Sequence, residues 1–143
     1  MINNKLYYSV LGLALLTCLV GIFSIPLMDI DASQYASISR ELLEGKSWIW
    51  FYDMGADYLD KPPMLFWLSA LSLKVFGIYD WAYRLPSFLF AILALYSTHA
   101  LANQWYGKNI ARLSAMVLAT SQAFFLITHD VRTDTMLMSW VIF

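Results

Sequence analysis

Carboxylates and a few cations are gathered in two stretches of an otherwise apolar chain. One stretch lies within residues 28–84 and the other within 130–134, and together they hold all ten Asp and Glu residues. A carboxylate can act as a general base, and a lysine or arginine can bind phosphate. The residues of interest are Asp31, Asp60, Lys61, Asp130, Arg132 and Asp134. A membrane protein with this distribution presents polar chemistry at one face of the bilayer.

Asp31 has two compatible interpretations. It stands where an N-cap belongs, before a helical pattern over 32–44, and Gln34 follows as a capping-box partner. As a cap it contributes about 1 kcal/mol. Alternatively, its carboxylate is a general base at the membrane surface, and capping would hold that carboxylate in one orientation. Asp29 lies close enough in the chain to compete for the role of base.

Lys61 directly precedes Pro62-Pro63, after which a second helix is predicted over 64–76. A lysine here can snorkel to the lipid headgroups. The alternative is a site for a lipid phosphate, because a helix N-terminus carries about half a positive charge and free N–H groups. Asp60 can bind a divalent cation or simply pair with Lys61, and a single carboxylate does not decide between them.

Asp130, Arg132 and Asp134 alternate where the chain leaves a long apolar run. They form either a solvated turn, in which ion pairs contribute little to stability, or a set of functional groups at membrane depth. Asp134 can also cap the helix that follows. His129 fits a polar interfacial residue better than a metal ligand, because zinc sites need three or more ligands. His99 is expected to pack against a neighbouring helix.

The composition is that of a membrane protein. Hydrophobic residues make up 60% and charged residues 13% of the chain, whereas about a quarter of the residues in soluble domains are charged. Crossing a bilayer takes about 20 apolar residues. The predicted spans are 6–27, 85–106, 110–128 and the start of a fourth at 135–143. We therefore expect an all-α, polytopic integral membrane protein that is cut inside its fourth helix, with residues 1–143 as the N-terminal part of one transmembrane domain.

The basic residues outside the acidic stretches set the expected orientation. Lys5, Lys108 and Arg112 flank the spans on one side without an acid among them, and the positive-inside rule makes that side cytoplasmic. The loop 28–84 then faces the periplasm or the cell exterior. Its amphipathic helix at 32–44 is expected to rest its apolar side in the membrane interface. The first run is interpreted as an uncleaved span of the inner membrane because it exceeds the length of a signal-peptide core.

The aromatic residues, the charge and the single cysteine give further information about the class of protein. The aromatic residues Trp48, Trp50, Phe51 and Tyr52 are typical of an interfacial belt. The net charge of −1 says nothing about nucleic acid, but the sequence has no basic cluster, so no nucleic-acid partner is expected. Cys18 is the only cysteine, so no internal disulfide can form.

Four segments in order along the chain carry a family resemblance. They are Asp31 to Glu41, Leu59-Asp60-Lys61-Pro62-Pro63, Trp81 to Ser87, and Arg132-Thr133-Asp134. Together they resemble motifs of GT-C-fold glycosyltransferases, in particular the lipid A aminoarabinose transferase and protein mannosyltransferase-like family. That resemblance implies a GT-C-like helical bundle. It also implies an enzyme that moves a sugar from a polyprenyl-phosphate donor to lipid A, a glycan or a protein at the outer face of the membrane.

The resemblance also implies roles for individual residues. Asp31 matches the acidic residue at the family's catalytic centre, and Asp134 matches a second active-site acid. Lys61 matches the residue that contacts the lipid phosphate, and Arg132 is assigned to the same donor phosphate. Asp60 stands where the family has an acidic residue linked to a divalent metal ion. Some members carry a basic residue where this chain has Gln34, so a donor-phosphate contact is not carried over to that position.

The chemistry of glycosyl transfer agrees with these residue types. Displacement at an anomeric carbon needs a base or charge-stabilising acid for the nucleophile and cations for the leaving phosphate. The competing interpretation is a non-enzymatic transporter subunit or scaffold, in which ionisable groups would be expected near the bilayer midplane. Residues 1–143 alone are expected to be inactive, because a few helices cannot enclose both a donor lipid and an acceptor.

Overall fold

The computed structural model describes residues 3–27, 31–45 and 48–142. Within these ranges the chain forms seven helices and one two-stranded hairpin, which confirms the expected all-α class. The elements in order are α1 (Asn4–Ser24), α2 (Asp31–Leu43), β1 (Tyr52–Asp53), β2 (Ala56–Asp57), α3 (Met64–Phe76), α4 (Asp80–Tyr106), α5 (Lys108–Thr120), α6 (Gln122–His129) and α7 (Thr133–Ile142).

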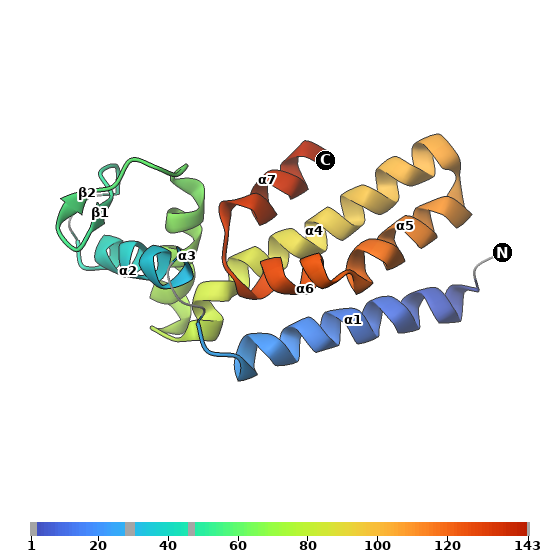
Figure 1. Ribbon diagram of the computed structural model, residues 1–143, viewed down its shortest axis with the longest axis horizontal. Helices are drawn as coiled ribbons and strands as arrows, with labels where there is room; N and C mark the ends of the chain where they lie inside the picture. Colours follow the sequence, from blue (N-terminus) through green and yellow to red (C-terminus); the bar gives the residue numbers. More distant parts are fainter. Residues whose placement is uncertain (1–2, 28–30, 46–47, 143) are drawn as a thin grey trace.

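The helices are arranged so that the segments with acidic residues lie at one end, whereas Lys5 at the start of α1 and Lys108 at the start of α5 lie at the other. Helices α1, α4, α5 and α6 run side by side, while α2, α3 and the hairpin sit beyond the end where α1 and α6 finish (Figure 1). The N-terminus and the turn between α4 and α5 lie at the other end (Figure 1). Two helices of the described chain, α1 and α4, are long and apolar enough to cross a membrane, and α5 with α6 would make a third span.

The third predicted span, 110–128, is not one straight helix. It divides into α5 and α6, whose axes differ by 56°. Ser121 causes the break, because its Oγ accepts a hydrogen bond from the Phe124 N–H at 3.2 Å and donates one to the Leu118 carbonyl at 2.8 Å. Serine is a favoured N-cap, so it begins a new helix inside an apolar run.

Other predicted span limits also shift. Helix α4 begins at Asp80 instead of residue 85, α1 ends at Ser24, and α7 begins at Thr133. Helix α4 continues through Pro86, which has no N–H and leaves the Ala82 carbonyl without its helical partner. The Ser72 hydroxyl of α3 donates to that carbonyl at 2.5 Å, which satisfies it and ties α3 to α4.

Helix α2 buries its apolar face in protein, not in the membrane interface that its amphipathic pattern predicted. Tyr35, Ile38 and Leu42 are buried against Leu65 and Phe66 of α3 in one hydrophobic core. The apolar periodicity shows that a face is covered, but it does not distinguish lipid from a neighbouring helix. Because α3 is itself strongly apolar, the two short helices cover each other.

A hairpin that the sequence analysis did not predict holds the polar face of α2. Its turn at Met54-Gly55 has φ values of 51° and 88°, as a type I′ turn requires. Gln34 Nε2 donates to Asp53 Oδ2 at 2.6 Å, and Glu41 Oε1 accepts from the Met54 N–H at 3.0 Å. Gln34 therefore binds the hairpin through its amide nitrogen, and its capping-box role stays a prediction.

The aromatic stretch before the hairpin divides between surface and core. Trp48 and Trp50 stay exposed, in keeping with the predicted belt, whereas Phe51 is buried in the core that α2 and α3 share. Phe51 packs against Phe66 with ring centroids 5.3 Å apart. The stretch therefore helps to fix the hairpin on the two short helices.

His129, at the end of α6, is a packing residue between α6 and α1. It is fully buried, with Nε2 3.1 Å from the Cys18 carbonyl oxygen and Nδ1 2.5 Å from that of Phe125. Both ring nitrogens thus face carbonyl oxygens, which leaves neither free for a metal. His99 is also a packing residue, as expected, and lies beside the Tyr7 ring.

We expect Gly21→Ala to destabilise the protein by about 1–3 kcal/mol, the usual cost of overpacking. A β-carbon at position 21 would collide with the His129 ring, which itself is held by carbonyls on both sides. Gly12→Ala on the same helix is the matched control, because nothing lies within 4 Å of its β-carbon position. Thermal unfolding in detergent should show a lower Tm for the first variant only. Equal Tm values would contradict the close packing.

Candidate active site

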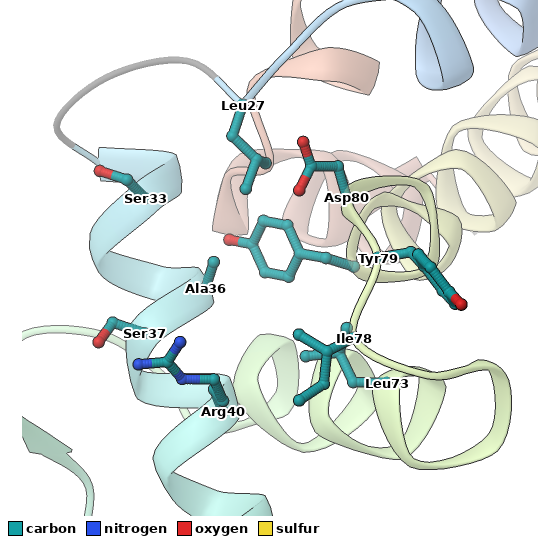
Figure 2. A pocket seen from close by; sticks show the side chains of 10 residues that line it. Leu27, Ser33, Ala36, Ser37, Arg40, Leu73, Ile78, Tyr79 and Asp80 are labelled. Atoms are coloured by element: carbon teal, nitrogen blue, oxygen red, sulfur yellow. The ribbon is translucent and has the colours of Figure 1, made fainter.

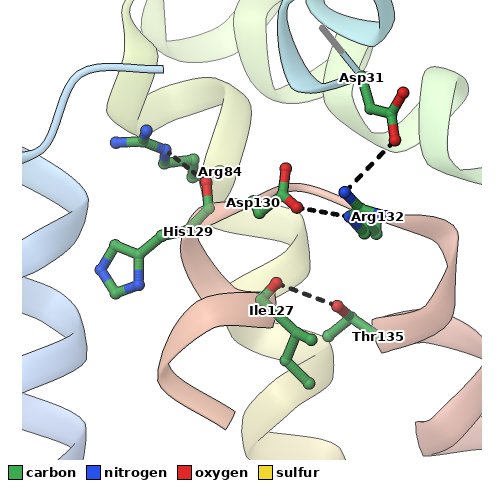
Figure 3. A network of polar contacts seen from close by, with 7 residues as sticks. All are labelled: Asp31, Arg84, Ile127, His129, Asp130, Arg132 and Thr135. Carbon is green, nitrogen blue, oxygen red and sulfur yellow. Dashed lines mark hydrogen bonds and ion pairs between the residues drawn. The ribbon is translucent and has the colours of Figure 1, made fainter. Parts of the chain in front are cut away.

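An ion-pair network joins two segments that are far apart in the sequence. Arg132, between α6 and α7, donates from Nε to Asp130 Oδ2 at 2.5 Å, and its Nη2 lies 3.4 Å from Oδ2 of Asp31, the first residue of α2 (Figure 3). Two of the residues predicted to act in chemistry are therefore neighbours. The network lies where the short helices meet the bundle (Figures 1 and 3).

Arg132 is held in its charged form and remains accessible. Its hydrogen bond to Asp130 raises the pKa of the guanidinium, and the charges of Asp130, Asp31 and Asp134 add to the effect. The side chains of Asp31 and Arg132 are 39% and 46% exposed, whereas that of Asp130 is 18% exposed. Exposed pairs of this kind contribute little to stability, so they are free to exchange partners with a ligand.

Asp31 and Asp134 occupy equivalent positions at the starts of their helices. Each lies in the first turn, Asp31 in α2 and Asp134 in α7, and neither is the residue before the helix. A carboxylate in the first turn still interacts favourably with the helix dipole. Asp134 is exposed, and its charge acts on Arg132, so it belongs to the same electrostatic environment.

Asp60 and Lys61 are exposed in the stretch between β2 and α3. Pro63 is the N-cap of α3 and makes no side-chain capping hydrogen bond, so the cap residue supplies no acceptor to the first-turn N–H groups. This agrees with the predicted helix start beside Lys61. Among the described residues, no ion pair joins the side chains of Asp60 and Lys61.

Tyr58 was missed as a site residue. Burial raises the pKa of its hydroxyl, and the adjacent Tyr35 and the charges of Asp60 and Asp31 raise it further. Tyr58 therefore lies within electrostatic reach of both Asp60 and Asp31. It belongs to the same stretch as Asp60, but nothing in the sequence places it near Asp31.

The described residues do not form a metal site around Asp60. No group of three His, Cys, Asp or Glu side chains within residues 3–27, 31–45 and 48–142 is placed to hold a metal ion. Asp60 supplies one carboxylate, whereas calcium and zinc sites use several protein ligands. The metal-binding role of Asp60 thus stays a prediction.

An apolar groove of about 210 Å³ separates the start of α3 from α7. Its lining includes Pro62, which follows Lys61, and Thr133, which follows Arg132. Both predicted phosphate-binding residues are therefore adjacent in sequence to the groove, and Trp140 of α7 forms part of its wall.

A second cavity of about 260 Å³ lies between α2 and the start of α4. Arg40 and Ser37 of α2 lie on one side of it, with Asp80 and Leu27 across from them (Figure 2). None of the five residues given roles above lines this cavity. It is thus separate from the ion-pair network.

The fold and the polar end of the bundle define the class, a GT-C-fold membrane protein. The chain superimposes with a TM-score of 0.88 on ArnT from Cupriavidus metallidurans bound to undecaprenyl phosphate, at 23% identity, covering 99% of this chain and 26% of that one. The apo state of the same protein gives a TM-score of 0.85 at 24% identity, over 94% and 25% of the two chains. These likenesses confirm the predicted GT-C helical bundle.

Sequence comparison specifies the family. The dolichyl-phosphate-mannose-protein mannosyltransferase family matches residues 60–143, more than half of the chain. The chain belongs to this family.

Two relatives illustrate how far the similarity extends. The undecaprenyl phosphate-alpha-4-amino-4-deoxy-L-arabinose arabinosyl transferase of Wigglesworthia glossinidia brevipalpis is 28% identical over an alignment of 142 residues that covers 96% of this chain and 25% of that protein. Arabinosyl transferase 2 of Proteus mirabilis is 30% identical over 128 residues, covering 88% of this chain and 23% of that protein. The chain spans about a quarter of the length of these relatives.

Proposed function

We propose that the whole protein transfers a sugar from a polyprenyl-phosphate donor to an acceptor at the extracytoplasmic face of the inner membrane. The main support for this proposal is the Asp31–Arg132 ion pair, in which a candidate base lies beside a candidate phosphate-binding cation. This pair lies at the end of the bundle away from the N-terminus and the α4–α5 turn (Figures 1 and 3). The names of the relatives support undecaprenyl phosphate-4-amino-4-deoxy-L-arabinose as the donor.

The reaction exchanges one bond at the anomeric carbon. The acceptor oxygen forms a bond to that carbon while the bond to the phosphate oxygen breaks, and the electron pair leaves with polyprenyl phosphate. Asp31 takes the acceptor proton, and Lys61 and Arg132 stabilise the leaving phosphate. Protonation of Asp31 removes one of the negative charges beside Arg132, which frees that guanidinium for the phosphate. Asp134, in the first turn of α7, is the second acid of the site.

The groove between α3 and α7 suits the first part of the prenyl chain. Its lining is almost entirely apolar, and Lys61 and Arg132 each directly precede a residue that lines it. Burying an apolar chain gains about 25 cal/mol for each Å² removed from solvent. The lipid would thus bind through its chain in the groove and its phosphate at the two cations.

A divalent cation at Asp60 remains a separate proposal, and no step of the reaction depends on it. Its support is a single exposed carboxylate beside Lys61. Assay of the full-length protein with and without EDTA is the test. Unchanged turnover in EDTA would remove the metal from the proposal.

Purified full-length protein in lipid vesicles provides the test of the transferase function. We expect undecaprenyl phosphate to be released from the aminoarabinose donor when lipid A is supplied, together with the matching mass increase in lipid A. Transfer to a glycan or peptide instead would reassign the acceptor. Polyprenyl-phosphate donors carrying aminoarabinose, mannose or glucose should each be tried with all three acceptor classes. If no donor reacts with any acceptor, the proposal is contradicted and the transporter or scaffold alternative is favoured.

The orientation is tested by labelling with a membrane-impermeant thiol reagent. In a cysteine-free full-length background, Ala56→Cys in the hairpin should react in cells whose outer membrane admits the reagent, because the hairpin belongs to the predicted outer loop. Asn109→Cys, beside Lys108 at the opposite end, is the exposed control and should react only after inner-membrane lysis. The reverse pattern would invert the topology.

A further inference from the structure

Arg84 of α4 is fully buried and binds four backbone carbonyls. Nη1 donates to Ile22 and Ile25 at 3.2 and 2.5 Å, Nη2 donates to Pro26 at 2.6 Å, and Nε donates to His129 at 3.2 Å. Among the described residues it forms no ion pair. The carbonyls thus provide the partners of this buried cation.

The bound carbonyls explain why a buried guanidinium is stable here. Ile22 lies in the last turn of α1, and His129 is the last residue of α6. Carbonyls at helix C-termini lack helical partners and carry partial negative charge, so a cation is favourable at both ends. The planar fork of arginine reaches several carbonyls at once, which a lysine ammonium cannot do with the same geometry.

The two helix ends that Arg84 joins lead directly into the candidate site. Beyond His129 the chain runs to Asp130 and Arg132, and beyond Pro26 it runs to Asp31. Figure 3 shows Arg84 at the His129 carbonyl, beside the Asp130–Arg132–Asp31 network. We infer that Arg84 is a positioning residue, which joins the ends of α1 and α6 so that Asp31 and Arg132 lie together. The kinetic part of this inference rests on the proposed transferase function.

The kinetic test is Arg84→Lys in the full-length protein, which keeps the charge and loses the fork. We expect kcat for sugar transfer to fall about 10- to 100-fold, the scale of a misplaced catalytic group. The KM for the donor should rise by a smaller factor than kcat falls, because Arg132 is displaced while Lys61 and the groove still bind the donor. Arg112→Lys is the matched control. Arg112 is also buried but lies over Tyr7, in α5 near the opposite end of the bundle, so its loss should lower Tm and leave kcat unchanged.

A double variant separates positioning from general stability. If Arg84 acts through the Asp31–Arg132 pair, Arg84→Lys should have little further effect on kcat once Arg132→Ala is present. Multiplication of the two effects would overturn the inference. The inference would also be overturned if Arg84→Lys and Arg112→Lys lowered Tm equally and lowered kcat equally.

A distance measurement tests the same point without activity. Spin labels at Arg40 on α2 and at Val141 on α7, both exposed, should show a broader distance distribution in Arg84→Lys than in Arg112→Lys. This result would stand even if the transferase assay found no substrate. An unchanged distribution would overturn the inference.

A spacing variant covers the case in which Arg84→Lys does not fold. Inserting one glycine after Leu27 leaves Arg84 and its carbonyl partners in place but lengthens the chain between them and Asp31. We expect the same fall in kcat. Full activity of this variant would show that the link from Arg84 to Asp31 does not set the position of the carboxylate.

Discussion

Replacing Asp31 by asparagine should lower the turnover of the full-length enzyme about 100-fold or more, the scale of losing a general base. Asparagine suits a helix start about as well as aspartate, so α2 should still form. The change removes the basicity and one of the carboxylates that contact Arg132. Initial rates of polyprenyl phosphate release give the turnover, and thermal unfolding reports whether the fold is kept.

Two further variants identify the carboxylate responsible. Asp57→Asn is the matched control, because Asp57 is an exposed acid of the hairpin at the same end of the molecule. It should leave turnover unchanged. Asp29→Asn tests the competing base, a residue outside the described part of the chain. Loss of turnover in Asp29→Asn with normal turnover in Asp31→Asn would move the role to Asp29, and normal turnover in both would limit Asp31 to a helix-start residue.

The sequence alone was sufficient to predict the features of the fold that depend on local composition. The lengths of the apolar runs predicted the long helices, and the uneven distribution of charge predicted that the acidic residues lie at one end of the bundle and Lys5 and Lys108 at the other. The break at Ser121 was not predicted, because hydrophobicity continues across it. A lone serine in an apolar run caps a helix in some contexts and bonds to its own helix in others, as Ser97 does.

The environment of an amphipathic face was not predictable from one segment. The pattern of Tyr35, Ile38 and Leu42 fits a lipid interface and a protein core equally well, and α3 determines which is present. The hairpin was missed for a related reason. Its strands have two residues each, and they are held by contacts with α2.

The site shows the same division between local and tertiary information. Residue types marked Asp31 and Arg132 as candidates, but their contact depends on how α1, α4 and α6 pack. In the sequence, Arg84 stood out only as part of the Trp81 to Ser87 segment of the family resemblance. Its function in the fold follows from four carbonyls contributed by two other helix ends, a relation that no local pattern records.

Lys61→Ala should weaken binding of undecaprenyl phosphate to the full-length protein about 10- to 100-fold, which corresponds to about 1.5–3 kcal/mol for a charge-assisted hydrogen bond. Lys61 is exposed next to the start of α3, whose first turn has no side-chain cap, and next to the apolar groove. The lysine charge and the free N–H groups would act on the same phosphate. Titration of the protein in nanodiscs with undecaprenyl phosphate, followed by tryptophan fluorescence, gives the affinity.

Lys74→Ala is the matched control, because Lys74 is an exposed lysine at the other end of the same helix. A lysine that only snorkels contributes through general attraction to the membrane surface, so both variants would then lose the same small amount of affinity. A phosphate contact predicts a large loss for Lys61→Ala alone. It also predicts partial recovery in Lys61→Arg, because arginine keeps the charge but places its donors differently. Equal affinities of the two alanine variants would assign Lys61 to the headgroups, leaving Arg132 as the only cation proposed for the phosphate.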